Sequence, residues 1–161
     1  MRYKLQLIFI WIFIIASCSK TASEYFEIAE VSLNEDQIEI AMENLEAIVK
    51  KYPRDSLASL AQYKLARIHL NWKNDLPAGF LALKKTVNKY GLSVQGKQAE
   101  KELIDFPEWI LNQSESLRKK KMIKESLSHL IYLIEQYPNH DITPKGQYLI
   151  GDIYMNDLRD F

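Results

Sequence analysis

Apolar and polar residues alternate along most of the chain with the spacing of amphipathic helices. Between Gln37 and Tyr52, apolar side chains recur every three or four positions, with Glu and Lys between them. This spacing places the apolar residues on one face of a helix. A second run, from Ser56 to Asn71, has the same pattern. Pro53 separates the two runs because a proline disfavours helical geometry at the residue before it.

The same pattern predicts helices over the whole chain after residue 23. We expect hairpins formed by 24–33 with 37–52, 56–71 with 76–90, and 109–118 with 122–137, followed by a helix over 145–156 without a partner helix. The segment 93–105 is also helical in pattern, and Pro107 separates it from the next helix. Tyr137 lies 47 residues after Tyr90, whereas Tyr90 lies 38 after Tyr52. The middle of the chain therefore holds an insertion or an extra helix.

The chain repeats itself after 85 residues. This shift aligns, without a gap, Ile38 with Ile123, Leu45 with Leu130, Tyr52-Pro53 with Tyr137-Pro138, Gln62-Tyr63 with Gln147-Tyr148, Ile68 with Ile153, Asn71 with Asn156 and Asp75 with Asp160. A weaker third copy lies between the two and contains Gly79, Leu83 and Tyr90-Gly91. Self-similarity at a fixed period indicates a repeat architecture.

The three copies share a small residue, a Leu four positions later and a helix-breaking residue about twelve positions later. The small residues are Ala41, Gly79 and Ser126. A small residue lets a neighbouring helix approach closely, and the Leu four positions later lies on the same face. We therefore expect each small residue at a helix crossing.

Composition narrows the possible functions. The 161 residues include 21 basic and 21 acidic side chains, so the formal net charge is zero and no basic excess indicates nucleic acid. A single Cys cannot form an intramolecular disulfide or a thiolate zinc site. Val and Thr are scarce and Leu, Ile and Glu are abundant, which favours helices over sheet.

The N-terminus has the pattern of a secretory signal. Arg2 and Lys4 precede a short apolar run, and no acidic residue occurs before Glu24. The run ends in Ile-Ala-Ser-Cys18, which resembles the lipobox of bacterial lipoproteins, in which the Cys is acylated and becomes the first residue after cleavage. The resemblance implies a signal peptide over 1–17, a lipidated polar tether over 18–23 and a membrane anchor at Cys18. An uncleaved membrane anchor, or a chance Cys in a signal sequence, is the alternative. Ser19 after the Cys is similar to the pattern of lipoproteins sorted to the outer membrane.

The helical part, 24–161, resembles tetratricopeptide repeats. Ala29, Ala41, Ala66 and Gly151 occupy the small-residue positions of that family, whereas His69 departs from its aromatic preference and Gln62 and Gln147 replace its bulky aromatic. This resemblance implies an all-α fold of tetratricopeptide-like hairpins stacked in a right-handed superhelix. Together, the lipobox, the tether and the motif of Ala41, Leu45 and Tyr52-Pro53 resemble the BamD-like outer-membrane assembly lipoproteins.

The BamD-like resemblance implies a periplasmic scaffold, anchored in the outer membrane, that holds proteins of the β-barrel insertion machinery. Two alternatives remain open. One is a periplasmic coordinator of cell division or cell-wall synthesis, and the other is the helical accessory region of a cell-wall-cleaving enzyme. The chain stops at Phe161, where the partner of the last helix should begin, so we expect the repeat domain to be C-terminally incomplete.

Two stripes of polar and aromatic residues are candidates for the partner-binding groove. Each stripe has residues four positions apart on one helix face, and the 85-residue shift relates the two. The stripes are Tyr63, Arg67 and Asn71, and Tyr148, Asp152 and Asn156. In tetratricopeptide proteins this face lines the concave surface, where such side chains could hydrogen-bond an extended peptide. Half-buried Tyr residues with a purely structural role are the alternative.

No pattern in the sequence predicts catalysis, a metal site or a cofactor. The segment from Gly91 to Gln98 differs from a phosphate-binding loop because it follows a helix and lacks the hydroxyl after Lys97. The three His residues have no partner at metal-binding spacing, and no small-molecule substrate is expected. The run 118–121 is basic, as is typical of a helix C-terminus; anionic lipid headgroups or an acidic partner are the alternatives.

Overall fold

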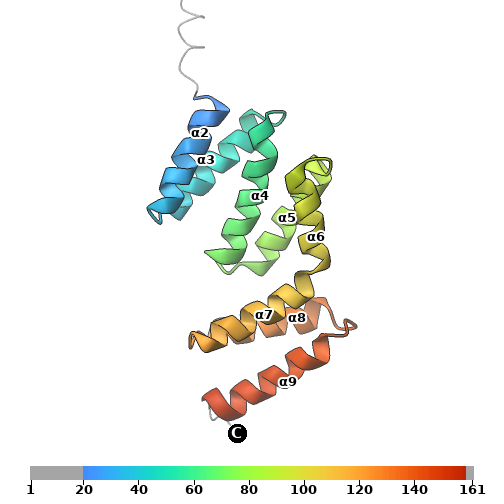
Figure 1. Cartoon of the computed structure of the whole chain (residues 1–161). Coiled ribbons are helices and arrows are strands. Elements are labelled where there is room, and N and C mark those ends of the chain that lie inside the picture. Colours follow the sequence, from blue (N-terminus) through green and yellow to red (C-terminus); the bar gives the residue numbers. More distant parts are fainter. Residues whose placement is uncertain (1–19, 159–161) are drawn as a thin grey trace, which may run out of the picture. The chain divides into compact units, whose positions relative to one another are not determined.

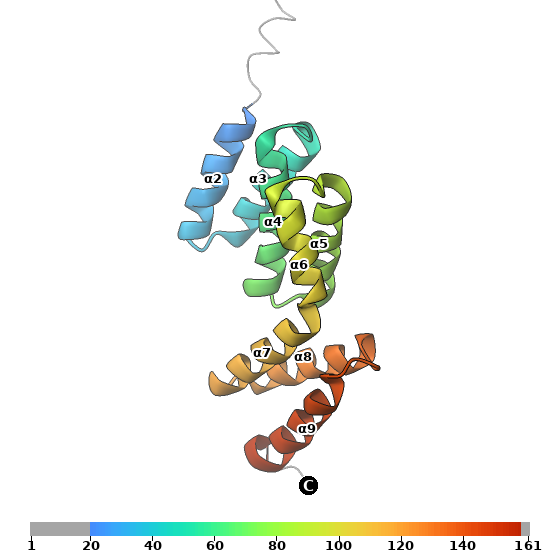
Figure 2. The ribbon, with the colours of Figure 1, turned by 45° about the vertical axis from the view of Figure 1, so that its right-hand side comes forward.

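The computed structural model describes residues 20–158, and this part of the chain is helical throughout apart from short turns (Figures 1 and 2). Its elements are α2 (Ala22–Asn34), α3 (Ile38–Lys51), α4 (Ser56–Asn71), α5 (Leu76–Tyr90), α6 (Val94–Ile104), α7 (Phe106–Lys119), α8 (Ile123–Gln136), α9 (Thr143–Ile153) and the π-helix η1 (Tyr154–Leu158). The prediction of an all-α fold built from sequential hairpins is confirmed for these residues. Cys18 and the expected signal peptide over 1–17 lie outside them.

The helix boundaries follow the hydrophobic pattern to within about three residues. Helix α7 begins at Phe106, three residues earlier than expected, because Pro107 lies in its first turn, where a missing N–H breaks no helical hydrogen bond. The segment 93–105, which was expected to be helical, contains α6, an extra helix between the two copies of the repeat. Asp105 alone separates α6 from α7.

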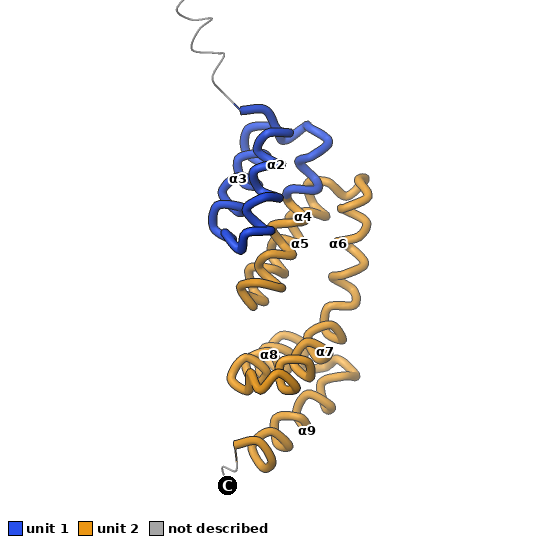
Figure 3. Tube along the Cα trace, turned by 60° about the vertical axis from the view of Figure 1, so that its left-hand side comes forward, with its two compact units in different colours: residues 1–61 blue, residues 62–161 orange. Residues whose placement is uncertain are grey.

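The chain divides into two compact units, residues 1–61 and 62–161 (Figure 3). In the first unit α2 packs against α3. Ala29, Ala41 and Leu45 are fully buried, as the small-residue rule requires. Helix α2 begins with a capping box in which Thr21 and Glu24 hydrogen-bond each other's backbone N–H groups.

The 85-residue repeat is present in the structure as well as in the sequence. Helices α3 and α8 begin and end at positions that differ by 85 residues. The residues after them, Tyr52 and Tyr137, have φ of −126° and −130° and ψ of 50° and 51°. Each donates its N–H to the carbonyl four residues earlier, at 2.8 and 2.9 Å. The Tyr-Pro pair therefore ends both helices in the same backbone conformation.

The second unit is organised around one hydrophobic core. Helix α5 packs on α6, and α8 packs on both α7 and α9. The core includes Ala66, Leu70, Leu76, Ala82, Leu83, Ala99, Phe106, Ile110, Leu111, Leu130, Leu133 and Ile153. The small residue of the third copy, Gly79, lies against Leu70 so closely that a Cβ at Gly79 would be 2.2 Å from Leu70 Cδ2. This is the close helix approach that the repeat rule predicts.

The glycines of the segment that resembles a phosphate-binding loop have a packing role instead. Gly96 lies in the first turn of α6, where a Cβ would be 2.0 Å from the carbonyl oxygen of Tyr90. Ser93 caps this helix by accepting a hydrogen bond from Gly96 N–H at 2.9 Å. The segment therefore joins two helices in a tight turn, whereas a phosphate-binding loop follows a strand.

Between residues 20 and 158, the helices are too short or too polar to cross a lipid bilayer.

Candidate functional site

A pocket of about 300 Å³ lies in the second unit among α4, α6 and α7. It is lined by Arg67, Leu70, Gln98, Lys101, Glu102, Asp105, Phe106 and Trp109. The single residue between α6 and α7 places the end of one helix next to the first turn of the other. Charged side chains from α6 and aromatic side chains from α7 consequently line the same pocket.

Glu102 joins two of the predicted groove residues at this pocket. Its carboxylate accepts a short hydrogen bond from the Tyr63 hydroxyl, and its Oε2 lies 3.3 Å from Arg67 Nη1. Gln98 donates to the same carboxylate at 3.2 Å. Burial, together with the hydrogen bond to Glu102, raises the pKa of Tyr63 to about 12. Tyr63 therefore remains a neutral phenol whose O–H donates a hydrogen bond to Glu102.

Two aromatic side chains of α7, Phe106 and Trp109, also line the pocket. The rings of Phe106 and Trp109 stack with their centroids 5.5 Å apart and an interplanar angle of 8°. Phe106 also contacts Phe80, with ring centroids 5.3 Å apart, and is almost fully buried. Trp109 is half-buried, so part of its indole faces the pocket. An aromatic surface beside a carboxylate–guanidinium pair provides both apolar contact and hydrogen-bonding groups for a peptide.

The second predicted stripe lies on α9 and η1 and is bound to α7. Arg118 Nη1 lies 2.5 Å from Asp152 Oδ2, and Arg118 Nε lies 2.6 Å from Asp157 Oδ2. Asn156 donates to Asp152 at 2.6 Å. The hydrogen bond from Arg118 holds the pKa of Asp152 below its usual value. Asp152 thus takes part in a helix-to-helix contact and Asn156 hydrogen-bonds to it, whereas Tyr148 is exposed.

The two stripes are not brought together into one groove. Tyr63 and Arg67 lie against α6, and Asp152 lies against α7. Asn71, the last residue of α4, is exposed. That these residues bind a partner stays a prediction. The structure adds that Tyr63, Arg67, Asp152 and Asn156 each have a hydrogen-bonding partner within the chain.

Sequence reasoning did not identify Glu102 or Trp109 as pocket residues. Glu102 belongs to α6 and Trp109 to α7, and the sequence pattern indicated only that both segments are helical. One signal was present in the sequence: Gln98 and Glu102 are four residues apart and so share a polar face of the predicted helix. The pairing of that face with Tyr63 depends on the packing of α6, which the local pattern does not determine.

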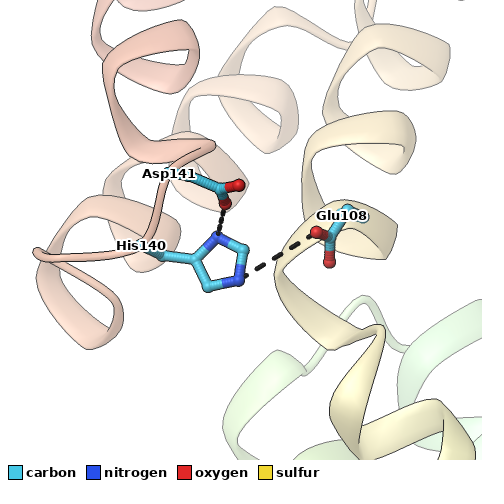
Figure 4. Close-up of side chains that lie close together, drawn as sticks. All are labelled: Glu108, His140 and Asp141. Atoms are coloured by element: carbon cyan, nitrogen blue, oxygen red, sulfur yellow. Dashed lines mark ion pairs between the residues drawn. The ribbon is translucent and has the colours of Figure 1, made fainter.

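Glu108, His140 and Asp141 form a second polar cluster at the start of α7 and in the turn before α9 (Figure 4). His140 Nδ1 lies 2.9 Å from Asp141 Oδ1, and His140 Nε2 lies 4.0 Å from Glu108 Oε1. One imidazole and two carboxylates are donors that a Zn²⁺ ion accepts. The Asp141 side chain, however, is 92% exposed, so the cluster lies open to water. When the imidazole is protonated, these contacts are ion pairs.

The basic run 118–121 lies where the sequence placed it, at the C-terminus of a helix. Arg118 and Lys119 are in the last turn of α7, where cations interact favourably with the helix dipole. Arg118 is held by Asp152 and Asp157, whereas the Lys121 side chain is 83% exposed.

Known proteins do not identify the chain. It matches no model of a protein family, and no curated protein is significantly similar to it in sequence. Within residues 20–158 the chain forms eight α-helices, which pack sequentially as antiparallel hairpins.

Proposed function

We propose that this protein is a scaffold that binds other envelope proteins and carries out no chemistry itself. Its hairpins stack as a tetratricopeptide-like right-handed superhelix, and it takes part in assembling β-barrel proteins of the outer membrane, as the BamD-like resemblance implies. The observation that carries the proposal is the 85-residue repeat, which recurs in helix boundaries and in helix-end geometry. Tandem helical hairpins present extended surfaces, and binding proteins is the common use of such surfaces.

The pocket among α4, α6 and α7 supports the proposal because its chemistry suits a peptide. Glu102 accepts hydrogen bonds, Arg67 and Lys101 supply positive charge, and Trp109 supplies an aromatic surface. The Tyr63–Glu102 hydrogen bond fixes the carboxylate before any partner arrives. Preorganisation of this kind lowers the entropic cost of binding.

The proposed location rests on the lipobox. Acyl chains on Cys18 would hold the protein at the periplasmic face of the outer membrane. A single acyl chain binds a membrane only marginally, whereas two or more give stable anchoring. Replacing Cys18 with Ala should move the protein from the membrane fraction to the soluble fraction of fractionated cells. Retention of Cys18→Ala in the membrane fraction would refute the anchor.

Site-specific photo-crosslinking tests the binding function. A photoreactive amino acid replaces Gln98, at the pocket, or Lys85, an exposed residue of α5 that does not line the pocket. Irradiation of living cells should yield adducts with β-barrel insertion components at position 98 and not at position 85. Equal labelling at the two positions would contradict a role for the pocket. Adducts with division or cell-wall proteins alone would favour the alternative functions.

A further inference from the structure

The turn between α5 and α6 carries the two most exposed large apolar side chains of residues 20–158. Leu92 is 97% exposed and Val94 is 77% exposed. Helices α5 and α6 pack on each other, and the turn forms one end of this helix pair (Figure 2). We refer to residues 91–94 as the α5–α6 tip. Side chains this exposed contribute little to the core, so the packing of the second unit does not account for two aliphatic residues at the tip.

The tip lies within a basic stretch of the chain. Residues 76–99 contain four Lys and no Asp or Glu, whereas the whole chain has equal numbers of basic and acidic residues. Lys89 lies in the last turn of α5 and Lys97 one turn into α6, and both are exposed. Positive charge therefore flanks the two apolar side chains on both helices.

Hydrogen bonds within the tip hold its backbone in one conformation. The N–H and the hydroxyl of Ser93 both donate to the carbonyl oxygen of Tyr90, at 2.9 and 2.7 Å. The Ser93 hydroxyl oxygen also accepts a hydrogen bond from Gly96 N–H at 2.9 Å. Backbone groups that are bonded within the protein do not depend on water, so these groups can approach a water-poor surface at a lower cost.

We propose that the α5–α6 tip contacts the surface of a membrane that contains anionic phospholipid. Leu92 and Val94 enter the boundary between headgroups and acyl chains, and Lys89 and Lys97 lie beside the phosphate groups. The lysines stand about one helical turn, about 5 Å, behind the apolar side chains along the helices. A bilayer has the same order of chemistry, with hydrocarbon inside and negatively charged phosphates outside it.

This contact is weak by itself. Two aliphatic side chains bury less apolar surface than one acyl chain, and a single acyl chain gives only marginal, reversible membrane binding. The tip therefore does not retain Cys18→Ala in the membrane fraction. The inference rests neither on acylation of Cys18 nor on a role in β-barrel assembly, because the basic stretch and the exposed tip are features of the second unit alone.

A fluorescent label at the tip tests the proposal directly. Cys18 is the only Cys of the chain, so full-length Cys18→Ala is a background in which one new Cys can be labelled. Leu92→Cys carries the environment-sensitive dye NBD at the tip. Ile104→Cys is the matched control, because Ile104 is also an exposed aliphatic residue, at 73%, and lies at the other end of α6. The dye reports only on its own surroundings, so vesicle binding by another segment does not change its emission.

The vesicles consist either of equal parts phosphatidylglycerol and phosphatidylcholine or of phosphatidylcholine alone. With the anionic vesicles, NBD emission at position 92 should rise at least about two-fold and shift to shorter wavelength. Emission at position 104 should not change with either kind of vesicle. Phosphatidylcholine vesicles should also leave emission at position 92 unchanged, since they offer no net negative charge to the lysines.

Two Glu variants of the chain labelled at position 92 separate the tip from the rest of α6. Val94→Glu places a negative charge at the tip, and Ile104→Glu makes the same change at the other end of the helix. Val94→Glu should raise the lipid concentration at half of the emission change at least about ten-fold, whereas Ile104→Glu should leave it unchanged. The double variant Lys89→Gln and Lys97→Gln should also raise it about ten-fold.

Three results would overturn the proposal. They are unchanged emission at position 92 with anionic vesicles, an equal rise with neutral vesicles, and equal effects of Val94→Glu and Ile104→Glu. An acidic protein is the other possible occupant of a basic tip. A photoreactive residue at position 92 that crosslinks to a protein in cells, together with vesicles that leave the NBD emission unchanged, would assign the tip to that protein instead.

Discussion

Asp36 and Lys121, which are 85 residues apart, have the same left-handed backbone conformation, with φ of 57° and 63°. Each lies in the turn that joins two helices of a hairpin. The following residue donates its N–H to an equivalent carbonyl in each copy, Gln37 to Ser32 at 2.8 Å and Met122 to Leu117 at 3.0 Å. The repeat therefore includes the turn as well as the helices.

The turn conformation leads to a prediction about glycine. Left-handed geometry costs an L-residue about 1–2 kcal/mol, although Asp tolerates it better than Lys does. Lys121→Gly should therefore raise the free energy of unfolding by about 0.5–1 kcal/mol, measured by urea denaturation. Asp36→Gly should have a smaller effect. A loss of stability in Lys121→Gly, or a larger gain in Asp36→Gly, would contradict this assignment.

Gly79 and Gly151, which occupy two different small-residue positions of the repeat, should respond oppositely to the addition of a methyl group. Gly79→Ala places a Cβ 2.2 Å from Leu70 Cδ2, and because Leu70 is buried it cannot move freely. We expect a loss of about 1–2 kcal/mol in the free energy of unfolding. Gly151→Ala meets nothing within 4 Å and gains helix propensity, so it should stabilise the chain by about 0.5–1 kcal/mol. Thermal unfolding of both variants measures the two changes. A loss at Gly79 and a gain at Gly151 identify a helix crossing at the first and an open helix face at the second.

A buried hydrogen bond joins α7 and α8 at their crossing. Ser126 Oγ donates to the carbonyl oxygen of Ser114 at 2.8 Å, and the equivalent positions in the first unit are Ala41 and Ala29. Ser126→Ala keeps the close approach but removes the bond, and should cost about 1 kcal/mol of unfolding free energy. Ser114→Ala is the control. It leaves that carbonyl in place, so urea denaturation should show a smaller loss of unfolding free energy than Ser126→Ala does.

Stability should fall in mild acid because of His129. Burial lowers the pKa of His129 below its ordinary 6.5, and its Nδ1 lies 2.9 Å from the Glu125 carbonyl oxygen. As the pH falls, His129 therefore binds a proton more readily in the unfolded chain than in the folded chain. The stability that neutral His129 contributes is complete above pH 6.5 and is lost as the pH falls toward the folded pKa. Through this one group, the free energy of unfolding changes by at most about 1.4 kcal/mol per pH unit.

Replacing His129 separates its contribution to the pH dependence of stability from the contributions of other titrating groups. His129→Gln should show a weaker fall in unfolding free energy between about pH 7 and about pH 5 than the original chain does. Urea denaturation at the two pH values measures the difference. Identical pH dependence in the two proteins would show that His129 does not titrate differently on folding.

The helices could be predicted from the sequence because each has a clear apolar period and a local stop signal. Tyr52-Pro53 and Tyr137-Pro138 ended their helices where expected, and the shared small residue marked the crossing at Gly79. Local sequence determines these features, since helix-end geometry and close packing need particular residues at particular spacings.

The candidate site was predicted only in part, because it depends on how helices meet. Tyr63 and Arg67 were recognised from their spacing on one helix. Their partner Glu102 is 35 residues beyond Arg67 and lies on α6, the extra helix that has no counterpart in the repeat. Neither periodicity nor the repeat indicates which helix face α6 turns toward α4. The π-helical end of α9 was missed as well, since no spacing rule distinguishes it from an α-helix.

Affinity capture from detergent-solubilised envelopes tests the proposed scaffold function most directly. Lys101→Glu reverses a charge that lines the pocket, and Lys85→Glu reverses an exposed charge of α5 that does not. We predict that the original chain and Lys85→Glu recover β-barrel insertion components, and that Lys101→Glu recovers at least about ten-fold less. Failure of the original chain to recover any such component, or equal recovery by the two variants, would contradict the account.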